Sequence, residues 1–265
     1  MPELPDVETW RRYVDATSLH HRIGRIDIDA PRMLQGVSRQ TLRARLQGDA
    51  FESTTRHGKH LFLRLESGPW LMLHFGMTGR LNYFKDPDGV PSHTRLLIHF
   101  DNGFHLACVW RRRLGRIGLV DDPASFVREE RLGPDAYEPG IELAEFKAML
   151  HGRRGSVKSA LMNQRFLAGI GNIYSDEILF QARLHPRSRC QRLDSQELAV
   201  LHRAIGHVLR IAIERQADPE RLPQSWLLVN RRERGECPRC GAPLAHMVIA
   251  GRTAYYCPDC QREQQ

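Results

Sequence analysis

Four of the six cysteines form two close pairs near the C-terminus, in a pattern that suits a metal ion. The pairs are Cys237-Pro-Arg-Cys240 and Cys257-Pro-Asp-Cys260, separated by sixteen residues. Four thiolates satisfy tetrahedral zinc and leave no position for a substrate water, which makes such a site structural. A segment this short cannot build its own hydrophobic core, so zinc binding must supply much of its folding energy, on the order of 10 kcal/mol. We therefore predict one structural Zn²⁺ bound by these four cysteines.

The N-terminus carries a second set of reactive groups. Pro2 follows the initiator Met, a setting in which methionine is normally removed, and removal would leave a secondary amine. An α-amino group has a pKa of about 8, so roughly a tenth is unprotonated and nucleophilic at pH 7. A secondary amine that attacks an aldehydic carbon gives an iminium ion, which labilises neighbouring bonds. Glu3 stands beside it and can serve as general acid or base. Most N-terminal prolines do nothing, so this chemistry needs support from the rest of the chain.

A glycine-rich turn is a candidate anion site. The run FLAGIGNIYSDEILF (166–180) places Gly169, Gly171 and Asn172 between apolar helical stretches, and Lys158 is nearby in sequence. Glycine permits backbone angles barred to other residues, and Asn is a good N-cap for the helix that follows. Free amides at a helix N-terminus bind anions, and Asn172 adds a donor. The pattern indicates a phosphate site, although an ordinary helix–turn–helix corner looks the same.

The residues between the cysteine pairs indicate a β-hairpin. The run MVIAGRTAYY (247–256) predicts two short strands with Ala250-Gly251-Arg252-Thr253 at the tip. An Arg at an exposed tip is usually only solvated. On a zinc-stiffened hairpin in a basic protein, Arg252 is equally a candidate phosphate contact.

These groups must be positioned by two different kinds of secondary structure. Residues 4–17 have apolar residues at helical spacing, whereas 22–120 are strand-like and interrupted by turn signals. Short strands at this spacing predict a sandwich or barrel. The clearest strands are 60–65, 70–75 and 95–100.

The second half of the chain is helical. Residues 121–141 are rich in Asp, Pro and Gly and are interpreted as a linker, and 216–236 are polar and irregular. The last helix begins with a capping sequence in which Asp194 precedes Glu197 by three residues. The predicted helices are 142–151, 156–166, 172–182 and 193–215.

Composition favours a polyanionic partner. Lys and Arg number 39 against 31 acidic residues, for a net charge of +8, and 41% hydrophobic residues suffice for packed cores. No stretch approaches the roughly 18 to 20 apolar residues of a membrane span, and the acidic N-terminus is unlike a signal peptide. We therefore expect a cytoplasmic protein, in which cysteine pairs bind metal and the isolated Cys108 and Cys190 serve packing.

Five segments that follow one another in a fixed order connect all these features. They are MPELPDVE at the start, RHGKHLFLRL (56–65), HFGMTGRL (74–81), AGIGNIYSDEILF (168–180) and the terminal C-x2-C…GRTAYYCPDCQ. Together they resemble the formamidopyrimidine-DNA glycosylase and endonuclease VIII family over essentially the whole chain. The opening PEL is more similar to the formamidopyrimidine branch.

The resemblance implies an α+β fold of three parts. These are an N-terminal helix plus β-sandwich (1–125), a helix–two-turn–helix domain (141–225) and a C-terminal four-cysteine zinc-finger hairpin (232–265). It implies that double-stranded damaged DNA is the partner, with monomeric action and association with the nucleoid when DNA is bound.

The resemblance also implies site residues. Pro2 attacks C1′ of the damaged nucleotide, Glu3 handles proton transfer at the sugar, and Lys59 contacts phosphate near the catalytic centre. Base release and strand cleavage by β,δ-elimination follow, without a catalytic metal. The residues that match phosphate-binding positions are Asn172, Arg252 and Lys158.

An enzyme of this kind must evert its target nucleotide and fill the vacated space. By resemblance, Met77 is the inserted methionine and Arg112 the arginine that faces the orphaned base. The family's aromatic wedge is Leu114 here, and Leu cannot stack between bases.

Further departures concern the lesion. Asp6 replaces the usual Glu, and Trp110-Arg111 replaces Asp-Pro. Residues 216–236 are too short for the loop that closes over an everted 8-oxoguanine in relatives. This difference argues against 8-oxoguanine and leaves the lesion open among an oxidised pyrimidine, a ring-opened purine, a bulky adduct and a bare abasic site.

Other classes of protein fit less of the chain. A damage-binding protein without turnover would need neither Pro2 nor Glu3. A zinc-ribbon transcription or RNA-binding factor leaves the N-terminal motif idle. A metal-dependent nuclease needs a carboxylate cluster for magnesium, and the sequence shows none.

Overall fold

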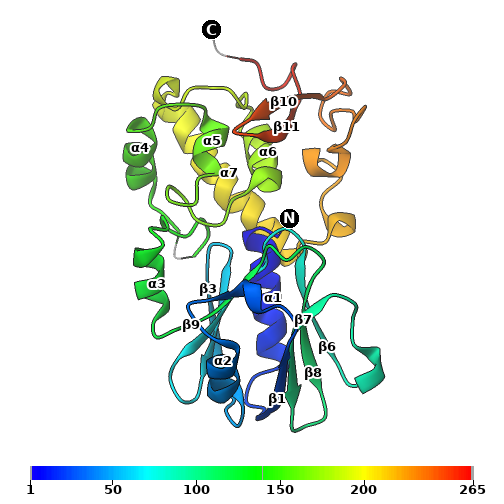
Figure 1. Ribbon diagram of the computed structural model, residues 1–265. Helices are drawn as coiled ribbons and strands as arrows, with labels where there is room; N and C mark the ends of the chain where they lie inside the picture. Colours follow the sequence, from blue (N-terminus) through cyan, green and yellow to red (C-terminus); the bar gives the residue numbers. More distant parts are fainter. Residues whose placement is uncertain (1, 139, 264–265) are drawn as a thin grey trace. The chain divides into compact units, whose positions relative to one another are not determined.

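The computed structural model describes residues 2–138 and 140–263 (Figure 1). The described chain folds into two compact units. The first unit comprises Asp6–Glu130 with Pro2, and the second comprises Glu3–Pro5 with residues 131–263. Helix α1 (Leu4–Thr17) has the predicted bounds and begins with residues that pack in the second unit.

The first unit is a β-sandwich, as predicted. One sheet has the strand order β1-β7-β8-β6, and the other has the order β2-β9-β5-β4-β3. All neighbours are antiparallel except β2 and β9, which are parallel. The strands are β1 (Ile23–Ile28), β2 (Leu34–Gln35), β3 (Phe51–His57), β4 (His60–Leu65), β5 (Trp70–His74), β6 (Gly79–Phe84), β7 (Thr94–Phe100), β8 (His105–Trp110) and β9 (Arg116–Val120).

A short helix, α3 (Pro123–Glu129), lies within the segment predicted as a linker. Asp122 caps it by accepting hydrogen bonds from the amides of Ala124 and Ser125, and Pro occupies the first helical position. Phe126 of this helix packs on Phe62 of β4, with ring centroids 5.5 Å apart. The Asp-Pro pair therefore starts a helix that covers the outer face of β4, which explains why β4 is almost continuously apolar.

The second unit is helical and ends in a two-stranded hairpin. Helix α7 carries the predicted capping box, in which Asp194 accepts from the Glu197 amide and the Glu197 side chain accepts from the Asp194 amide. The helix predicted at 156–166 stops at Leu161, because the Asn163 side chain bonds the Arg165 amide and turns the chain. The helices are α2 (Arg39–Leu46) in the first unit and α4 (Leu143–His151), α5 (Val157–Leu161), α6 (Asn172–Gln181) and α7 (Ser195–Glu214) in the second.

Short 3₁₀ turns complete both units. The segment predicted as irregular, 216–236, contains two of them, and its residue Trp226 is buried in the core of the second unit. The turns are η1 (Pro31–Met33), η2 (Pro87–Gly89), η3 (Cys190–Arg192), η4 (Pro219–Arg221) and η5 (Leu227–Asn230).

The terminal hairpin pairs β10 (Ala245–Ile249) with β11 (Arg252–Tyr256). Its turn consists of Ala250 and Gly251, both at positive φ (49° and 73°), so Arg252 begins β11 and does not lie in the turn. Two positive φ values match the strand twist of a tight hairpin. No helix in the described part of the chain is long and apolar enough to cross a membrane.

Candidate functional site

The buried carboxylate of Glu3 occupies the N-terminus of α6. Its Oε2 accepts hydrogen bonds from the amides of Gly171 (2.6 Å) and Tyr174 (3.2 Å), and its Oε1 accepts from Ile173 (2.8 Å). The N-cap is Gly171, one residue before the predicted Asn172. The anion site predicted at this helix is therefore filled by the chain's own carboxylate, which satisfies three amides that the helix leaves unpaired.

The glycine turn allows the N-terminal segment to approach this closely. Gly169 has φ +114°, and a Cβ there would lie 2.4 Å from Cδ1 of Leu4. Its carbonyl accepts the Leu4 amide at 3.0 Å, and the Gln164 side chain braces the turn by bonding Gly169 and Ile170. The N-terminal motif thus meets the glycine turn through Glu3 and Leu4, the residues that directly follow the half-buried Pro2.

Asn172 and Arg252 are brought together by the hairpin. The Asn172 side-chain amide donates to the carbonyl of Thr253 at 3.0 Å, directly after the exposed Arg252. The Asn172 Oδ1 atom is buried and has no hydrogen-bond partner among the described residues. The Asn172 side chain at the start of α6 is therefore held against the backbone of β11, at the residue next to Arg252.

Lys158, a predicted phosphate contact, lies inside the helical unit. Its side chain is completely buried, and Nζ donates to Asp176 (2.6 Å), to the Ser175 hydroxyl (2.8 Å) and to the Asn172 carbonyl (3.1 Å). Burial lowers the pKa of Lys158, while the Asp176 carboxylate opposes this shift. These hydrogen bonds use the donors of Lys158 inside the protein, where its Nζ holds the carbonyl of the first residue of α6.

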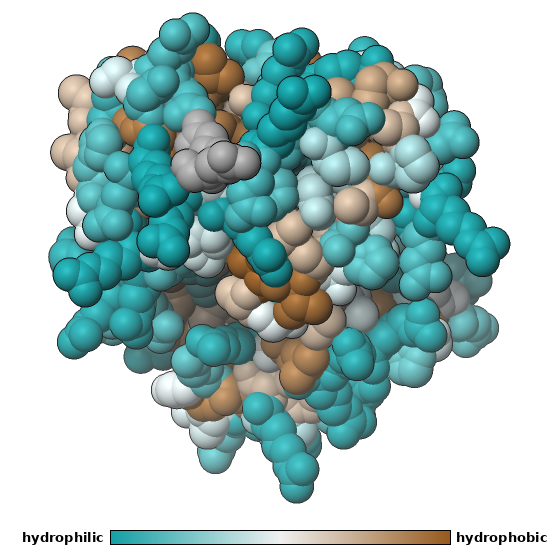
Figure 2. All heavy atoms as spheres, turned by 90° about the horizontal axis from the view of Figure 1, so that it is seen from above, coloured by the Kyte–Doolittle hydropathy of each residue, from teal (hydrophilic) through white to brown (hydrophobic). Residues whose placement is uncertain are grey.

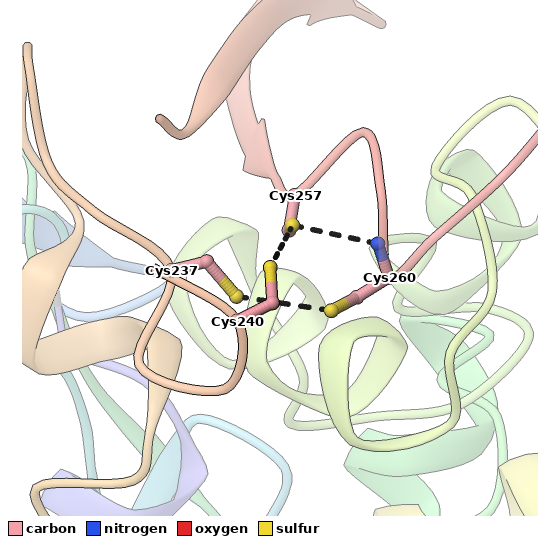
Figure 3. Close-up of side chains that lie close together, drawn as sticks. All are labelled: Cys237, Cys240, Cys257 and Cys260. Atoms are coloured by element: carbon pink, nitrogen blue, oxygen red, sulfur yellow. Dashed lines mark hydrogen bonds between the residues drawn. The ribbon is translucent and has the colours of Figure 1, made fainter. Parts of the chain in front are cut away.

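The four paired cysteines converge on one point (Figure 3). Their sulfur atoms all lie within 4.8 Å of one another. Two of them come from the first Cys-x2-Cys turn and two from the second. Backbone amides of Arg239 and Cys260 approach the first sulfur of each knuckle, both at 3.4 Å. Four thiols in this arrangement fit a tetrahedral structural zinc ion.

In the first unit, three predicted space-filling residues form one surface cluster. Met77 lies between β5 and β6, and Arg112 and Leu114 lie between β8 and β9. The Arg112 amide donates to the Thr78 hydroxyl (2.9 Å), and its guanidinium reaches the Met77 sulfur at 3.5 Å. Gly76, at φ +59°, permits the contact, because a Cβ there would lie 2.5 Å from the Leu114 carbonyl oxygen.

Exposure sets these side chains apart. Polar residues cover most of the face shown in Figure 2, and hydrophobic residues form small groups on it. Large exposed hydrophobic residues are normal on a protein surface when they occur singly, and informative when they lie together on adjacent loops, as Met77 and Leu114 do. Across the described surface they are Met77 (42%), Val90 (42%), Leu114 (55%) and Val248 (69%).

Trp110 braces the cluster, a role that sequence reasoning did not assign. It is fully buried and stacks on Phe75 with centroids 6.2 Å apart, and its indole N–H has no partner among the described residues. A Cβ at Gly79 or Gly115 would lie within 2.5 Å of this nitrogen. The aromatic ring that replaces the family's Asp-Pro therefore packs both loops from beneath.

Lys59 lies in the tight turn between β3 and β4, beside Gly58 at φ +55°. The Arg56 guanidinium donates to the Gly58 carbonyl at 3.3 Å and pairs with the buried Glu8 at 3.2 Å. Burial raises the pKa of Glu8, but hydrogen bonds from Arg11 and Arg12 and the charges of Arg11 and Arg56 lower it to about 2. Glu8 and Arg56, which the sequence did not single out, thus fix the turn that carries Lys59.

These features define a DNA glycosylase of the helix–two-turn–helix class: the β-sandwich, the glycine turn that holds Glu3, and the hairpin with four cysteines. The chain belongs to the formamidopyrimidine-DNA glycosylase family. Residues 1–117 match that family's N-terminal domain, residues 132–222 match its H2TH domain, and residues 236–262 match the zinc finger found in FPG and IleRS.

Individual relatives agree over the full length. The chain is 37% identical to the formamidopyrimidine-DNA glycosylase of Thermomicrobium roseum (98% of this chain, 99% of the relative) and 34% identical to that of Pelotomaculum thermopropionicum (99% of both). Among solved structures, the Lactococcus lactis enzyme bound to DNA with an AP site has a TM-score of 0.89 at 26% identity, covering 98% of this chain and 100% of that one. MutM in complex with DNA containing carbocyclic 8-oxo-G also scores 0.89, at 28% identity, covering 99% and 100%.

Proposed function

We propose that the Pro2 amine of this base-excision-repair glycosylase is the nucleophile for both base release and cleavage of the abasic site. The observation that carries the proposal is the anchoring of Glu3, next to Pro2, by three amides of α6. A carboxylate that is fixed next to the amine supports the proposal, because a general acid–base must be held within reach of the proton that it transfers.

The reaction needs these two residues, the DNA and one water molecule. The Pro2 nitrogen forms a bond to C1′ as the glycosidic bond breaks, and the base leaves after taking up a proton. Ring opening of the sugar gives an iminium ion, which makes the C2′ proton acidic. Loss of that proton with departure of the 3′-phosphate completes β-elimination, and loss of the C4′ proton with departure of the 5′-phosphate completes δ-elimination. Hydrolysis of the iminium by water then releases Pro2. Glu3 is the proposed proton carrier at the sugar.

The remaining site residues are proposed to grip the duplex. Lys59, Asn172 and Arg252 contact phosphates, while Met77, Arg112 and Leu114 fill the space that the everted nucleotide leaves. The exposure of Met77 and Leu114 supports this, because an apolar wedge must be free to enter the base stack.

The lesion is proposed to be other than 8-oxoguanine. Much of 216–236 is packed on helices: Leu227 is fully buried, and the Leu228 amide donates to Glu177 at 2.9 Å. A segment anchored in this way supports the proposal that no long lesion-covering loop is present. Ring-opened purines and oxidised pyrimidines are the first candidates for a panel of duplex substrates.

We further propose the domain division 1–125, 141–225 and 232–265, monomeric action, and a cytoplasmic, nucleoid-associated location. The net charge of +8 supports association with DNA.

A borohydride trapping experiment tests the nucleophile. The methionine-processed protein is incubated with a duplex that contains one abasic site, and borohydride reduces any iminium to a stable adduct. We expect an adduct that persists in EDTA and disappears in Pro2→Ala. A folded protein that binds the duplex without forming an adduct would instead be a damage-binding protein on this fold.

A further inference from the structure

A buried charge cluster joins α6 to the zinc-finger hairpin. At its centre is Asp176, which is fully buried and lies one helical turn after Asn172 on the same face. Its Oδ1 accepts from Lys158 at 2.6 Å, and its Oδ2 accepts from Arg231 Nε at 2.8 Å and from the Tyr255 amide at 3.2 Å. One carboxylate therefore contacts α5, the residue after η5, and strand β11.

Arg231 extends the connection along β11. Its Nη2 donates to the Thr253 carbonyl at 3.2 Å, and its guanidinium lies 4.9 Å from the centre of the Tyr255 ring. The same Thr253 carbonyl accepts the Asn172 side-chain amide at 3.0 Å. Arg231 and Asn172 thus converge on the peptide oxygen next to Arg252.

This convergence affects the distance between the two proposed phosphate contacts, Asn172 and Arg252. Asn172 is on a helix and Arg252 on a hairpin, so their separation depends on how the hairpin is held against the helix. A rigid, fully hydrogen-bonded ionic network can fix such a separation, because its members have few other ways to be satisfied. Preorganised contacts bind more tightly because less ordering is required on binding.

We propose that Asp176 is a positioning residue for DNA binding: through Arg231 and the Tyr255 amide it fixes β11 on α6, so that Asn172 and Arg252 act as one phosphate-binding pair. The inference rests on the proposed phosphate role of that pair. It assigns a function to Asp176 and Arg231, neither of which takes part in the proposed chemistry.

The test compares Asp176→Asn with the wild type on a duplex that contains a tetrahydrofuran abasic analogue. Asn keeps the shape but loses the charge that holds Arg231. We expect a protein that retains zinc, binds about 10-fold more weakly, and has a log–log salt slope smaller in magnitude by about 1, as when one phosphate contact is lost. Arg231→Gln, at a partly exposed position, should reproduce the effect and serves if Asp176→Asn does not fold.

A double-mutant cycle separates positioning from simple destabilisation. Arg252→Ala alone should weaken binding, and adding Asp176→Asn to it should cost less than about 3-fold more, because the two changes damage the same contact. Asp194→Ala is the matched control. It removes an acid that bonds two amides of α7 and lowers stability without touching β11, so the salt slope should stay unchanged.

Two results would overturn the inference. One is a folded, zinc-bound Asp176→Asn protein with wild-type affinity and slope. The other is a loss of DNA affinity from Asp176→Asn that is as large in the Arg252→Ala protein as in the wild type. If the Arg252→Ala protein binds DNA as tightly as the wild type, the proposed phosphate role of Arg252 is wrong. This single variant therefore tests the proposed function separately from the inference about Asp176.

Discussion

The Glu3 carboxylate and the Ile173 amide, 170 residues apart in the chain, are joined by a 2.8 Å hydrogen bond. This bond and its two neighbours at Gly171 and Tyr174 hold the residue next to the proposed nucleophile. The helix N-terminus that the sequence presented as an external anion site thereby becomes an internal support.

Replacement of Glu3 by Gln should separate chemistry from support. Gln keeps one acceptor oxygen for the α6 amides but cannot carry a proton, so we expect base release to slow by about 10²- to 10⁴-fold while DNA affinity changes little. Single-turnover kinetics on a ring-opened purine duplex measure the first quantity, and titration with an abasic analogue measures the second. A folded Glu3→Gln protein with wild-type turnover would remove Glu3 from the mechanism.

The proposed role of Met77 as a wedge predicts a loss of DNA affinity when its side chain is shortened. Met77→Ala should weaken binding to an abasic-analogue duplex by about 10-fold, because less apolar surface fills the vacated stack. Val90, equally exposed at 42% in the same unit, is the matched control, and Val90→Ala should bind normally. Equal losses of DNA affinity in the two variants would mean that Met77 does not act as a wedge.

The zinc site predicts one metal ion per chain and a dependence of DNA binding on it. Cys240→Ser, or a strong chelator, should release zinc, disorder β10 and β11, and weaken binding by at least about 10-fold, since zinc supplies the folding energy of such a segment. Cys190→Ala is the control, because Cys190 is buried in the helical core away from the cluster and should leave zinc content at one. Full affinity after zinc release would contradict the role of the hairpin.

Acid should destabilise the first unit through His60 and Glu8. Burial, and then the charge of His74, lowers the pKa of His60 to about 3, so the folded state keeps it neutral while the unfolded state takes up a proton below about pH 6.5. The unfolded state then binds more protons, and stability falls with pH; Glu8, with its pKa lowered to about 2, adds to this loss below about pH 4.5.

The measurement is the melting temperature between about pH 7.5 and pH 5, where His60 contributes and Glu8 does not. We expect a decrease of several degrees in the wild type and a smaller decrease in His60→Phe, which has no proton to gain. The Phe side chain also removes the buried Nδ1 atom, which has no partner among the described residues. Identical pH dependence in both proteins would show that His60 does not limit acid stability.

Much of this protein follows from local sequence patterns. The first helix, the strand 60–65, the capping box of α7 and the zinc ligands depend on residues close together in the chain, where periodicity and turn chemistry act directly. The helix α3 was missed although Asp122-Pro123 is a sound start signal, because the surrounding Pro and Gly residues suggested a linker.

The tertiary structure decided which local possibilities are realised. Asn172 was a good N-cap by type, yet Glu3 satisfies the amides at the start of α6, because folding brings in a charged acceptor from the N-terminus, 168 residues away from Gly171. Lys158 had the charge for a phosphate contact, but burial beside Asp176 used its donors within the protein. Sequence determines which groups are available, whereas long-range packing determines which partner each one meets, since an unpaired buried charge costs too much free energy to persist.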